Sequence, residues 1–433
     1  MIRREFIRKT SLAGLALSKP AGSFFIPFQS RKYRTVLIGA GWWGNNILGE
    51  AMASGACEIV GICDVDKNFV EETAERVEKS MGNRPKKYID YRELLSDLKP
   101  DIAIIATPEH WHALQTIEAL KSGCDIYVEK PIAHTINEGK AIVAAQKKYG
   151  KVIQVGLHRR TSPHIIKGQE MLKSGEVGDV KMIKACVYSR TTDTMVQPLN
   201  EPPKYLDWDL YLGPAAYQPY ESSVHPRGFR KYLNMTNGTI GDWGVHWMDQ
   251  ILWWSEEQYP KKIYSTGGMV NPGCGYDAPD YQTATFEFDN FIVEWEHRRL
   301  GGSGSEKSPV GTYFYGTKGV LFMGFYDGTT FYPDGRDESP IHIDHGMHDP
   351  DGQNIKELWA DFLEAIEGKK PPVAGIESSH RATTMSLLAM ISYKTGRQIL
   401  WDGEAEKILD DPEALSLMQR EYRAPWIYPE INI

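Results

Sequence analysis

Four residues in the middle of the chain are spaced as they would be along one face of a helix. Asp242 and His246 are four residues apart, and Asp249 and Trp253 continue the same face. The opposite face of such a helix is apolar: Trp243, Trp247, Ile251 and Trp254. A histidine beside a carboxylate can accept the proton of a substrate hydroxyl. The same spacing also fits a buried ion pair in a core helix, so the pattern alone leaves both interpretations open.

A glycine-rich turn near the start of the chain has the spacing of a dinucleotide-binding motif. Gly39, Gly41 and Gly44 follow an apolar run and open a helical segment, with Trp42 and Trp43 between them. Such glycines allow a tight turn, the approach of a pyrophosphate to the backbone, and the packing of helix on strand. The free N–H groups at the start of the helix would face the phosphates. Because any strand–helix turn can use glycine, the interpretation depends on the residues that follow.

Asp64 ends the second apolar run, a couple of dozen residues after the glycine turn. A carboxylate at this place in a dinucleotide-binding unit hydrogen-bonds the hydroxyls of the adenosine ribose. Its charge would repel a 2′-phosphate, so Asp64 favours NAD over NADP. An aspartate at a strand end can also simply form a turn, and that alternative stays open at the level of sequence.

Short apolar strands alternate with amphipathic helices through the first third of the chain. Strands are expected at 33–39, 58–64, 101–107, 125–129 and 151–156, and helices at 44–54, 67–81, 91–97, 111–122 and 137–149. This alternation predicts an α/β fold with a doubly wound parallel sheet of the Rossmann type. Ligands bind at the carboxyl ends of such strands, where Gly39, Asp64 and Thr107 lie.

The composition excludes one class of partner. The chain has 433 residues, which is long enough for two domains, and 41% of them are hydrophobic. The net charge is −8 and the chain has no Lys/Arg-rich run, so the sequence has no basic region of the kind that binds nucleic acid.

The cysteines are scattered without C-x-x-C spacing, so we expect buried thiols rather than a metal site or a disulfide framework: Cys57, Cys63, Cys124, Cys186 and Cys274.

The first thirty residues resemble an export signal. Arg3 and Arg4 are followed by Phe6, further basic residues and a short apolar stretch at 12–17, which is the pattern of a twin-arginine signal. That stretch is too short to span a bilayer. We therefore expect export to the periplasm by the twin-arginine machinery, with a cofactor already bound. No small-x-small cleavage site follows, so an uncleaved anchor and a basic amphipathic start to the first domain stay open as alternatives.

Glu129-Lys130-Pro131, which closes the expected strand at 125–129, is the triplet at which the sequence resembles a known family. From about residue 31 to about residue 407 the chain resembles the Gfo/Idh/MocA oxidoreductases, which include glucose–fructose oxidoreductase and inositol dehydrogenases. The other marks of the resemblance are the glycine turn, Asp64, Thr107-Pro108-Glu109-His110 and Gly241-Asp242-Trp243-Gly244-Val245-His246. Segments 206–214, 380–381 and 401–402 are similar to the exported branch of that family.

The resemblance implies two domains after the export segment. Residues 1–30 would be the signal, 31–156 the Rossmann domain, 157–410 a C-terminal α/β domain, and 411–433 a tail. In the family a large, mostly antiparallel sheet of the second domain carries substrate and often mediates assembly, so we expect a homo-oligomer, either dimer or tetramer. Strand-like runs agree in outline at 181–189, 261–267, 283–288, 291–297 and 312–316, with helices at 355–367 and 378–395. The late helices are expected to pack back against the first domain.

The resemblance also assigns roles to residues. His246 would accept the proton, Asp242 would orient or tune it, and Lys130 would polarise the reacting oxygen or exchange a proton with it. The expected NAD contacts are Gly39, Gly41, Trp42, Trp43, Gly44, Asp64, Thr107, Pro108, His110, Glu129, Lys130 and Pro131. Pro131 would hold the strand end rigid, with a cis bond as one way of doing so. By their place in the sequence, four positions are candidates for substrate contact: His158, Arg159, Trp208 and Asp249.

One loop is dense in residues that can bind metal: His342, Asp344, His345, His348 and Asp349. Such density can hold a metal ion. The spacing matches no standard zinc pattern, and the family that the chain resembles uses no metal. We therefore expect no metal, and interpret the loop as substrate contact or plain polar surface.

Three functions compete at this point. The leading hypothesis is an NAD-dependent dehydrogenase of a sugar, sugar derivative or cyclitol, for which an exported protein has reason to retain its cofactor. The alternative is a glycoside-cleaving enzyme that keeps NAD bound, oxidises a ring hydroxyl transiently, eliminates the aglycone and returns the hydride. The third is a non-catalytic, NAD-dependent sugar sensor. A sensor would be expected to have lost Lys130 or His246, and the chain has both.

Overall fold

The computed structural model describes residues 32–189, 201–301, 306, 308–335, 337–347 and 353–431. The expected export segment at 1–30 lies outside these described residues. Two sheets, with the helices around them, make up the described part of the chain and pack together as one unit.

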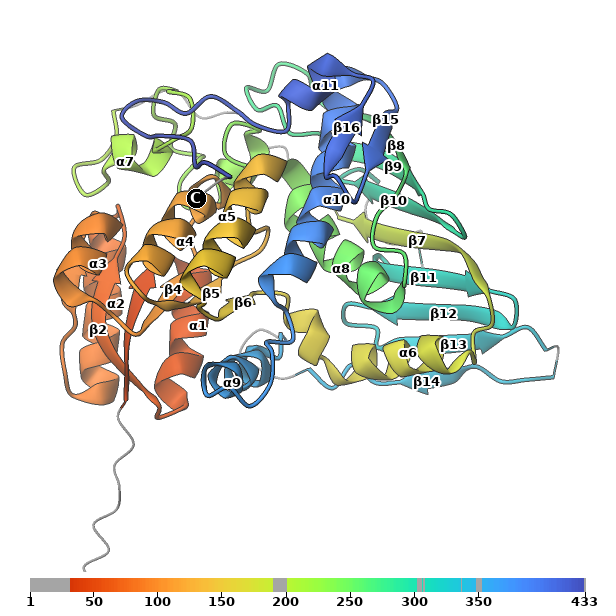
Figure 1. Cartoon of the computed structure of the whole chain (residues 1–433), viewed down its shortest axis with the longest axis horizontal. Helices are drawn as coiled ribbons and strands as arrows, with labels where there is room; N and C mark the ends of the chain where they lie inside the picture. Colours follow the sequence, from red (N-terminus) through yellow and green to blue (C-terminus); the bar gives the residue numbers. More distant parts are fainter. Residues whose placement is uncertain are drawn as a thin grey trace, which may run out of the picture. The chain divides into compact units, whose positions relative to one another are not determined.

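The first sheet is parallel, as the alternating pattern predicts (Figure 1). In the described part of the chain it has six strands in the order β3-β2-β1-β4-β5-β6, which is the order of a dinucleotide-binding fold. The strands are β1 Tyr33–Ile38, β2 Cys57–Cys63, β3 Lys86–Tyr88, β4 Ile102–Ile105, β5 Asp125–Val128 and β6 Ile153–Val155. The helices between them are α1 Trp42–Ala53, α2 Lys67–Met81, α3 Tyr91–Leu98, α4 His112–Lys121 and α5 Ile136–Tyr149. Helices cover both faces, so the apolar strand residues are buried.

Local sequence explains where these helices begin and end. Asp66 and Asp90 each accept a hydrogen bond from a backbone N–H in the first turn of α2 and α3. Thr135 and Glu138 form a capping box at the start of α5, in which each side chain binds the other residue's backbone N–H. Gly150 ends α5 in the left-handed conformation that glycine adopts without strain.

The second sheet is large and mostly antiparallel, as the resemblance implies. Its ten described strands run in the order β14-β13-β12-β11-β7-β10-β9-β8-β15-β16. Among these described strands, β7 and β10 are the one parallel pair. The strands are β7 Val180–Tyr188, β8 Lys262–Gly268, β9 Tyr281–Glu287, β10 Ile292–Arg298, β11 Val310–Gly316, β12 Gly319–Gly324, β13 Thr329–Pro333, β14 Ile341–Ile343, β15 Ile399–Asp402 and β16 Lys407–Leu409.

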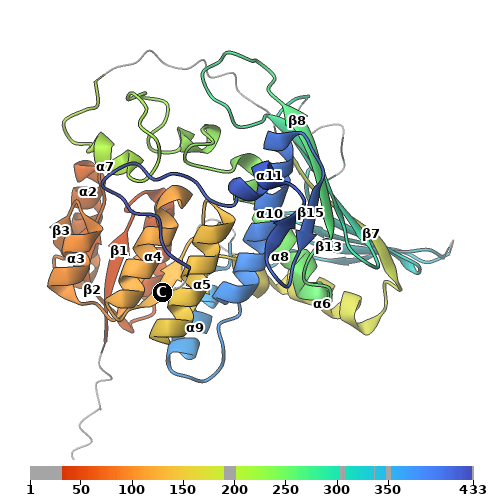
Figure 2. The same cartoon turned by 45° about the horizontal axis from the view of Figure 1, so that its top comes forward.

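Helices cover one face of the second sheet. α6 Pro163–Ser174, α8 Val245–Trp254 and α10 Ile376–Thr395 lie on the same side of it in both views (Figures 1 and 2). α10 also packs against α5, and α9 Ile355–Ile366 packs against α1. The expected return of the late helices to the first domain is therefore confirmed. The remaining short helices are α7 Trp208–Leu212, α11 Pro412–Ser416 and single turns at Glu109–Trp111, His158–Thr161 and Gly228–Lys231.

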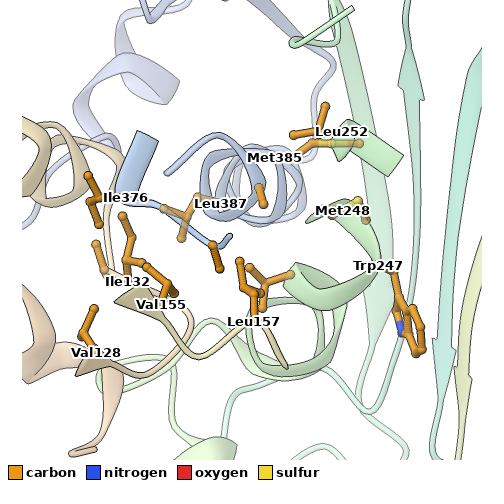
Figure 3. Close-up of a cluster of buried hydrophobic side chains, with 14 of the residues drawn as sticks. Val128, Ile132, Val155, Leu157, Trp247, Met248, Leu252, Ile376, Met385 and Leu387 are labelled. Atoms are coloured by element: carbon orange, nitrogen blue, oxygen red, sulfur yellow. The ribbon is translucent and has the colours of Figure 1, made fainter. Parts of the chain in front are cut away.

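One buried apolar cluster joins the two sheets (Figure 3). It takes side chains from the ends of β5 and β6, from α8 and from α10: Val128, Val155, Leu157, Met248, Leu252, Met385 and Leu387. Because close-packed interiors resist sliding, the cluster holds the start of α8 at a fixed place relative to the end of β5. This packing brings residues of the two domains together.

Some elements differ from the sequence expectation. β3 is a polar edge strand, so it lacks the apolar run by which strands are predicted. Where the pattern predicts one strand at 312–316, the structure has β11, β12 and β13 joined by short turns, which apolar periodicity does not resolve. Helix α6 and the short strands β14 to β16 are also outside the predicted set.

A wide turn precedes α8. Residues Ile240–Gly244 form a π-helical turn, so the regular helix begins after Asp242. A π turn holds more residues than an α turn and changes which residues share a face. Trp243, predicted on the apolar face, packs against the buried core and also lines the cavity described below. Trp247 is fully buried, as predicted.

Candidate active site

A cavity of about 800 Å³ opens at the carboxyl ends of β1, β2, β4 and β5. This edge of a parallel sheet is where doubly wound folds bind ligands, and the volume is that of a small-molecule site. The wide turn before α8 and the segment Gly228–Lys231 supply its other wall. The predicted site residues that line it are Gly39, Gly41, Trp42, Trp43, Asp64, Thr107, Pro108, Glu129, Lys130, Pro131, His158, Asp242 and His246.

The glycine turn has the geometry that a dinucleotide needs. Gly39 has a φ of +96°, which residues with a side chain rarely adopt. A Cβ on Gly39 would lie 2.7 Å from the carbonyl carbon of Ala106, and a Cβ on Gly44 would lie 2.0 Å from the carbonyl oxygen of Gly39. Around Gly41 the space is open. The turn therefore leaves room for a pyrophosphate at the start of α1, and the residues present fit a dinucleotide.

Asp64 lies at the cavity end of β2 and is bonded to the glycine turn. Its Oδ2 accepts the backbone N–H of Ala40 at 2.7 Å, and its Oδ1 accepts that of Asp66 at 2.9 Å. Burial raises the pKa of Asp64 to about 6, against the opposing effect of these two hydrogen bonds. The carboxyl group is thus fixed beside the turn, where an adenosine ribose would lie.

Lys130 and Asp242 form an ion pair inside the cavity. The Nζ of Lys130 donates to Oδ1 of Asp242 at 2.8 Å and to its backbone oxygen at 2.9 Å. The Nε of Arg230 donates to Oδ2 of the same carboxylate at 3.1 Å. Burial alone would raise the pKa of Asp242, but the charges of Lys130 and Arg230 hold it below its ordinary value. Asp242 therefore remains an anion that fixes Lys130 at the end of β5, next to the cis bond between Lys130 and Pro131.

His246 reaches the same cavity from the first turn of α8. Burial lowers its pKa well below the ordinary value, and the charge of Lys130 lowers it further. Its Nδ1 has no hydrogen-bond partner among the described residues. The His158 ring lies 4.9 Å away, centroid to centroid, and burial lowers the pKa of His158 in the same direction. His246 is therefore a neutral imidazole, which can accept a proton.

Two protein-family models match the chain. The Gfo/Idh/MocA model described as an oxidoreductase family with an NAD-binding Rossmann fold matches residues 33–157. The model for the C-terminal alpha/beta domain of the same family matches residues 187–428, which is more than half of the chain. The chain belongs to the Gfo/Idh/MocA oxidoreductase family. Its first sheet is accordingly an NAD-binding Rossmann fold.

Several relatives of this Gfo/Idh/MocA protein are named enzymes. D-Glucoside 3-dehydrogenase of Escherichia coli is 22% identical over 390 residues, which cover 86% of this chain and 98% of that protein. Glycosyl hydrolase family 109 protein 1 of Akkermansia muciniphila is 30% identical over 169 residues, which cover 37% of this chain and only 34% of that protein. The solved WlbA dehydrogenase of Bordetella pertussis, in complex with NADH and UDP-GlcNAcA, has the same fold: the TM-score is 0.64 at 18% identity, over 86% of this chain and 99% of that one.

Two predicted residues of this oxidoreductase support the cavity from behind. His110 is buried, and its Nε2 pairs with the backbone oxygen of Tyr211 at 3.0 Å. Burial lowers the pKa of His110 to about 3. Trp208 stacks on Tyr211 with ring centroids 5.0 Å apart. Tyr211 itself lines the cavity, whereas His110 and Trp208 contact Tyr211 and do not line the cavity themselves.

Arg159 and Asp249 also lie behind the cavity wall. The guanidinium of Arg159 lies 3.7 Å from the ring centroid of Phe325, and its Nη2 donates to Gln353 at 3.1 Å. Phe325 and Gln353 line the cavity. Asp249 instead forms a buried ion pair with Arg160 at 2.7 Å. For Asp249 the structure thus shows the ion pair of a core helix, the other interpretation that its spacing allowed.

Besides Glu109 of the motif at 107–110, two arginines that no motif of the sequence includes line the cavity. The guanidinium of Arg227 lies 4.6 Å from the ring centroid of Trp42, near the start of α1. Arg227 thus brings positive charge to the place where a pyrophosphate would bind, whereas Arg230 lies beside Asp242 in the same cavity. Glu109 is buried, and its Oε1 accepts the backbone N–H of Asn237 at 2.7 Å. The basic cluster at 227–231 is the signal in the sequence that points to the two arginines.

Apart from Cys63, which lines the cavity, the remaining predicted features lie outside it. All five cysteines are buried and free, as predicted. In the loop that is dense in metal-ligand residues, Nε2 of His342 lies 3.4 Å from Oδ1 of Asp344, while His348 and Asp349 are outside the described residues. Within the described ranges, no group of three ligand-type side chains could hold a metal ion. Among the helices that the structure describes, none is long and apolar enough to cross a bilayer.

Proposed function

We propose that this protein is an NAD-dependent dehydrogenase that oxidises a hydroxyl group of a sugar, a sugar derivative or a cyclitol. The proposal rests on one observation. The side chains of Lys130, Asp242 and His246 line the same cavity as the glycine turn. The two halves of the reaction, binding of a dinucleotide and removal of a hydroxyl proton, are thus served by one site.

His246 is the proton acceptor in this proposal. Its imidazole is neutral, because burial and the charge of Lys130 lower its pKa, so a substrate hydroxyl can give its proton to the ring. A nicotinamide dinucleotide held by the glycine turn and Asp64 would supply the acceptor for the hydride of the carbon that carries the hydroxyl, and the product would be a carbonyl compound. Loss of one proton and one hydride balances the oxidation of an alcohol.

Lys130 polarises the reacting oxygen. An ammonium group has three N–H donors, and two of those of Lys130 are directed to Asp242. The third is free to donate to the substrate oxygen, whose negative charge grows as the proton leaves. Asp242 pairs with Lys130 and Arg230 in the structure, so we assign it the positioning of Lys130 in place of the expected orienting of His246.

The substrate class and the cofactor preference rest on further support. A relative that aligns along most of this chain is named for the oxidation of a glucoside, and another is named inositol 2-dehydrogenase, 27% identical over 158 residues. The carboxyl group of Asp64, fixed at the ribose end of the cavity, favours NAD over NADP. We also propose that the cofactor is retained between turnovers.

The redox-neutral glycosidase is the second candidate. It is supported by the 30% identity to the Akkermansia muciniphila protein, whose name is that of a glycosyl hydrolase. That likeness covers little more than a third of this chain, whereas the glucoside dehydrogenase aligns with 86% of it. The sugar sensor is least supported, since Lys130 and His246 are both in the cavity.

One experiment separates the three candidates. The purified protein is tested for bound NAD, then offered free sugars, cyclitols and aryl glycosides. Accumulation of NADH supports the dehydrogenase; release of the aglycone with no net NADH supports the glycosidase; sugar binding with neither signal supports the sensor. His246→Ala should abolish turnover and leave NAD bound, while His342→Ala, a matched change at a half-exposed histidine of β14, should leave turnover unchanged. Retained turnover in His246→Ala would contradict the role of His246.

Two further expectations stay as proposals. Export by the twin-arginine route is supported by the sequence of the first thirty residues. Assembly into a dimer or tetramer is supported by the second sheet, whose neighbouring strands β8, β9 and β10 carry large exposed side chains: Tyr264, Tyr281 and Ile292. The molar mass in solution tests the assembly, and a monomer would contradict it.

A further inference from the structure

The segment after α11 is anchored to the Rossmann domain by buried polar contacts. Glu138, whose side chain is fully buried, accepts Nε of Arg420 at 3.1 Å and the hydroxyl of Tyr422 at 2.7 Å. The hydroxyl of Tyr428 pairs with that of Thr135 at 2.6 Å. Thr135 and Glu138 are the capping box of α5, so the end of the chain is fastened to a rigid helix start. Such a buried, charge-assisted anchor is strong evidence of a specific docked position.

The same segment also holds α7. The Nε of Arg423 donates to the backbone oxygen of Gly213 at 3.1 Å, and its Nη2 donates to that of Asp209 at 2.8 Å. The backbone N–H of Arg423 donates to Pro214 at 3.1 Å. Figures 1 and 2 show this dark blue segment running from α11 across the top of the Rossmann domain, beside α4 and toward α7. The segment therefore contacts both the Rossmann domain and the region of α7, and both of these contribute residues to the lining of the cavity.

Trp426, in the middle of the segment, lines the cavity itself. Its ring meets that of Trp111 edge to face, with centroids 4.7 Å apart, and the guanidinium of Arg92 lies 4.6 Å from its ring centroid. Trp111 in turn contacts Tyr91, and both line the same cavity. Trp426 is thus one aromatic wall of a pocket built from three rings.

The strand order places this wall at the adenosine end. Tyr91 follows β3 and Asp64 ends β2, on one side of the central strand β1. Lys130 ends β5 on the other side, where His246 also reaches the cavity. A dinucleotide that meets Lys130 with its nicotinamide and Asp64 with its ribose must direct its adenine toward Tyr91 and Trp426.

We propose that Trp426 is an adenine-binding residue and that residues 420–428 must undock before NAD can leave. This inference rests on the proposed function and deepens it, because it supplies a physical reason for a retained cofactor. An adenine ring between aromatic side chains is held by stacking, and the anchors at Glu138 and Asp209 keep the wall in place.

The test is the rate at which bound NADH leaves the protein. The protein is loaded with NADH and mixed with excess NAD, and the loss of bound NADH fluorescence is followed. Trp426→Ala should release NADH about tenfold faster or more, since loss of one aromatic–base contact weakens binding by that order. Trp426→Tyr should restore slow release in part, and Ile427→Ala, a neighbour that is 80% exposed, should leave the rate unchanged.

A second measurement localises the effect. In protein freed of cofactor, Trp426→Ala should weaken binding of AMP and leave binding of nicotinamide mononucleotide unchanged. Unchanged NADH release in Trp426→Ala, or equal weakening of both mononucleotides, would overturn the proposal. Neither measurement uses a sugar, so failure of this inference is distinguishable from failure of the proposed dehydrogenase activity.

Discussion

In the proposed mechanism, His246 is a neutral base, and Lys130 is a cation that Asp242 fixes in place. Burial decides the state of His246, since the low pKa of His246 follows from desolvation and from the nearby ammonium group. The identities of these residues can be predicted from the sequence. Which of them pair with each other cannot be predicted from the sequence, because spacing along a regular helix places Asp242 near His246. In the structure, the π turn and the long side chain of Lys130, just after β5, make Lys130 the partner of Asp242.

The protonation of His246 predicts the pH dependence of catalysis. Since only the neutral ring accepts a proton, and its pKa lies well below the ordinary 6.5, kcat should hold as the pH falls through 6.5 and decline only at lower pH. The profile is measured with saturating NAD, so that protonation of Asp64, whose pKa is about 6, does not enter through cofactor affinity. A fall in kcat centred at or above pH 6.5 would contradict the assignment.

The positioning role of Asp242 predicts a selective defect. Asp242→Asn removes the charge that holds Lys130, so kcat should fall about tenfold to a hundredfold with little change in NAD affinity. Arg230→Gln is the control, because Arg230 binds the other oxygen of Asp242 and its side chain is 45% exposed. It should cost less than Asp242→Asn. Equal kinetics for Asp242→Asn and the unaltered enzyme would show that Lys130 does not need this partner.

At the scale of elements, the first domain follows from its sequence more closely than the second. Helix α2 has the bounds that its pattern predicts, and each of the five expected Rossmann strands is present. The polar strand β3 has no apolar signal, and the segment after α11 is expected as a tail although Arg420 is buried against Glu138. Contacts between residues far apart in the chain decide such cases, and periodicity does not report them.

The glycine turn gives a matched pair of substitutions. In Gly44→Ala the new Cβ would lie 2.0 Å from the backbone oxygen of Gly39, so the turn must move and NAD binding should be lost. In Gly41→Ala the Cβ meets nothing within 4 Å. That variant should keep its melting temperature, because surface changes of this kind cost within about 0.5 kcal/mol. Melting temperature and NAD affinity are measured for both, and normal NAD binding by Gly44→Ala would contradict this account of the turn.

At the scale of the whole described unit, the interdomain cluster makes the two sheets depend on each other. α8 and α10 pack on the second sheet and on the end of the first, so the packing of the two domains sets the geometry of the cavity between them. The sequence resemblance predicts that the late helices return to the first domain. The residues at which they do so, among them Leu387 and Val155, are identified by the structure alone (Figure 3).

Leu387→Ala tests this dependence. Removing a buried leucine side chain should lower the free energy of unfolding by about 2–5 kcal/mol. Because the core is continuous, both domains should unfold in one transition that moves as a whole to lower denaturant concentration. Two separate transitions, of which the mutation shifts only one, would show that the domains are independent. Circular dichroism and tryptophan fluorescence, followed in the same denaturant series, measure the outcome.

A single-turnover measurement tests whether one cavity joins a bound NAD to the proposed base His246 for net oxidation of a sugar-type hydroxyl. NAD-loaded protein is mixed with each of a panel of pyranosides and cyclitols, and the absorbance of reduced nicotinamide is followed. We expect at least one substrate to leave NADH and a carbonyl product in equal amounts, and His246→Ala to yield neither while it still holds NAD. Release of an aglycone with no lasting NADH, or NADH formation by His246→Ala at the rate of the unaltered protein, would contradict this expectation.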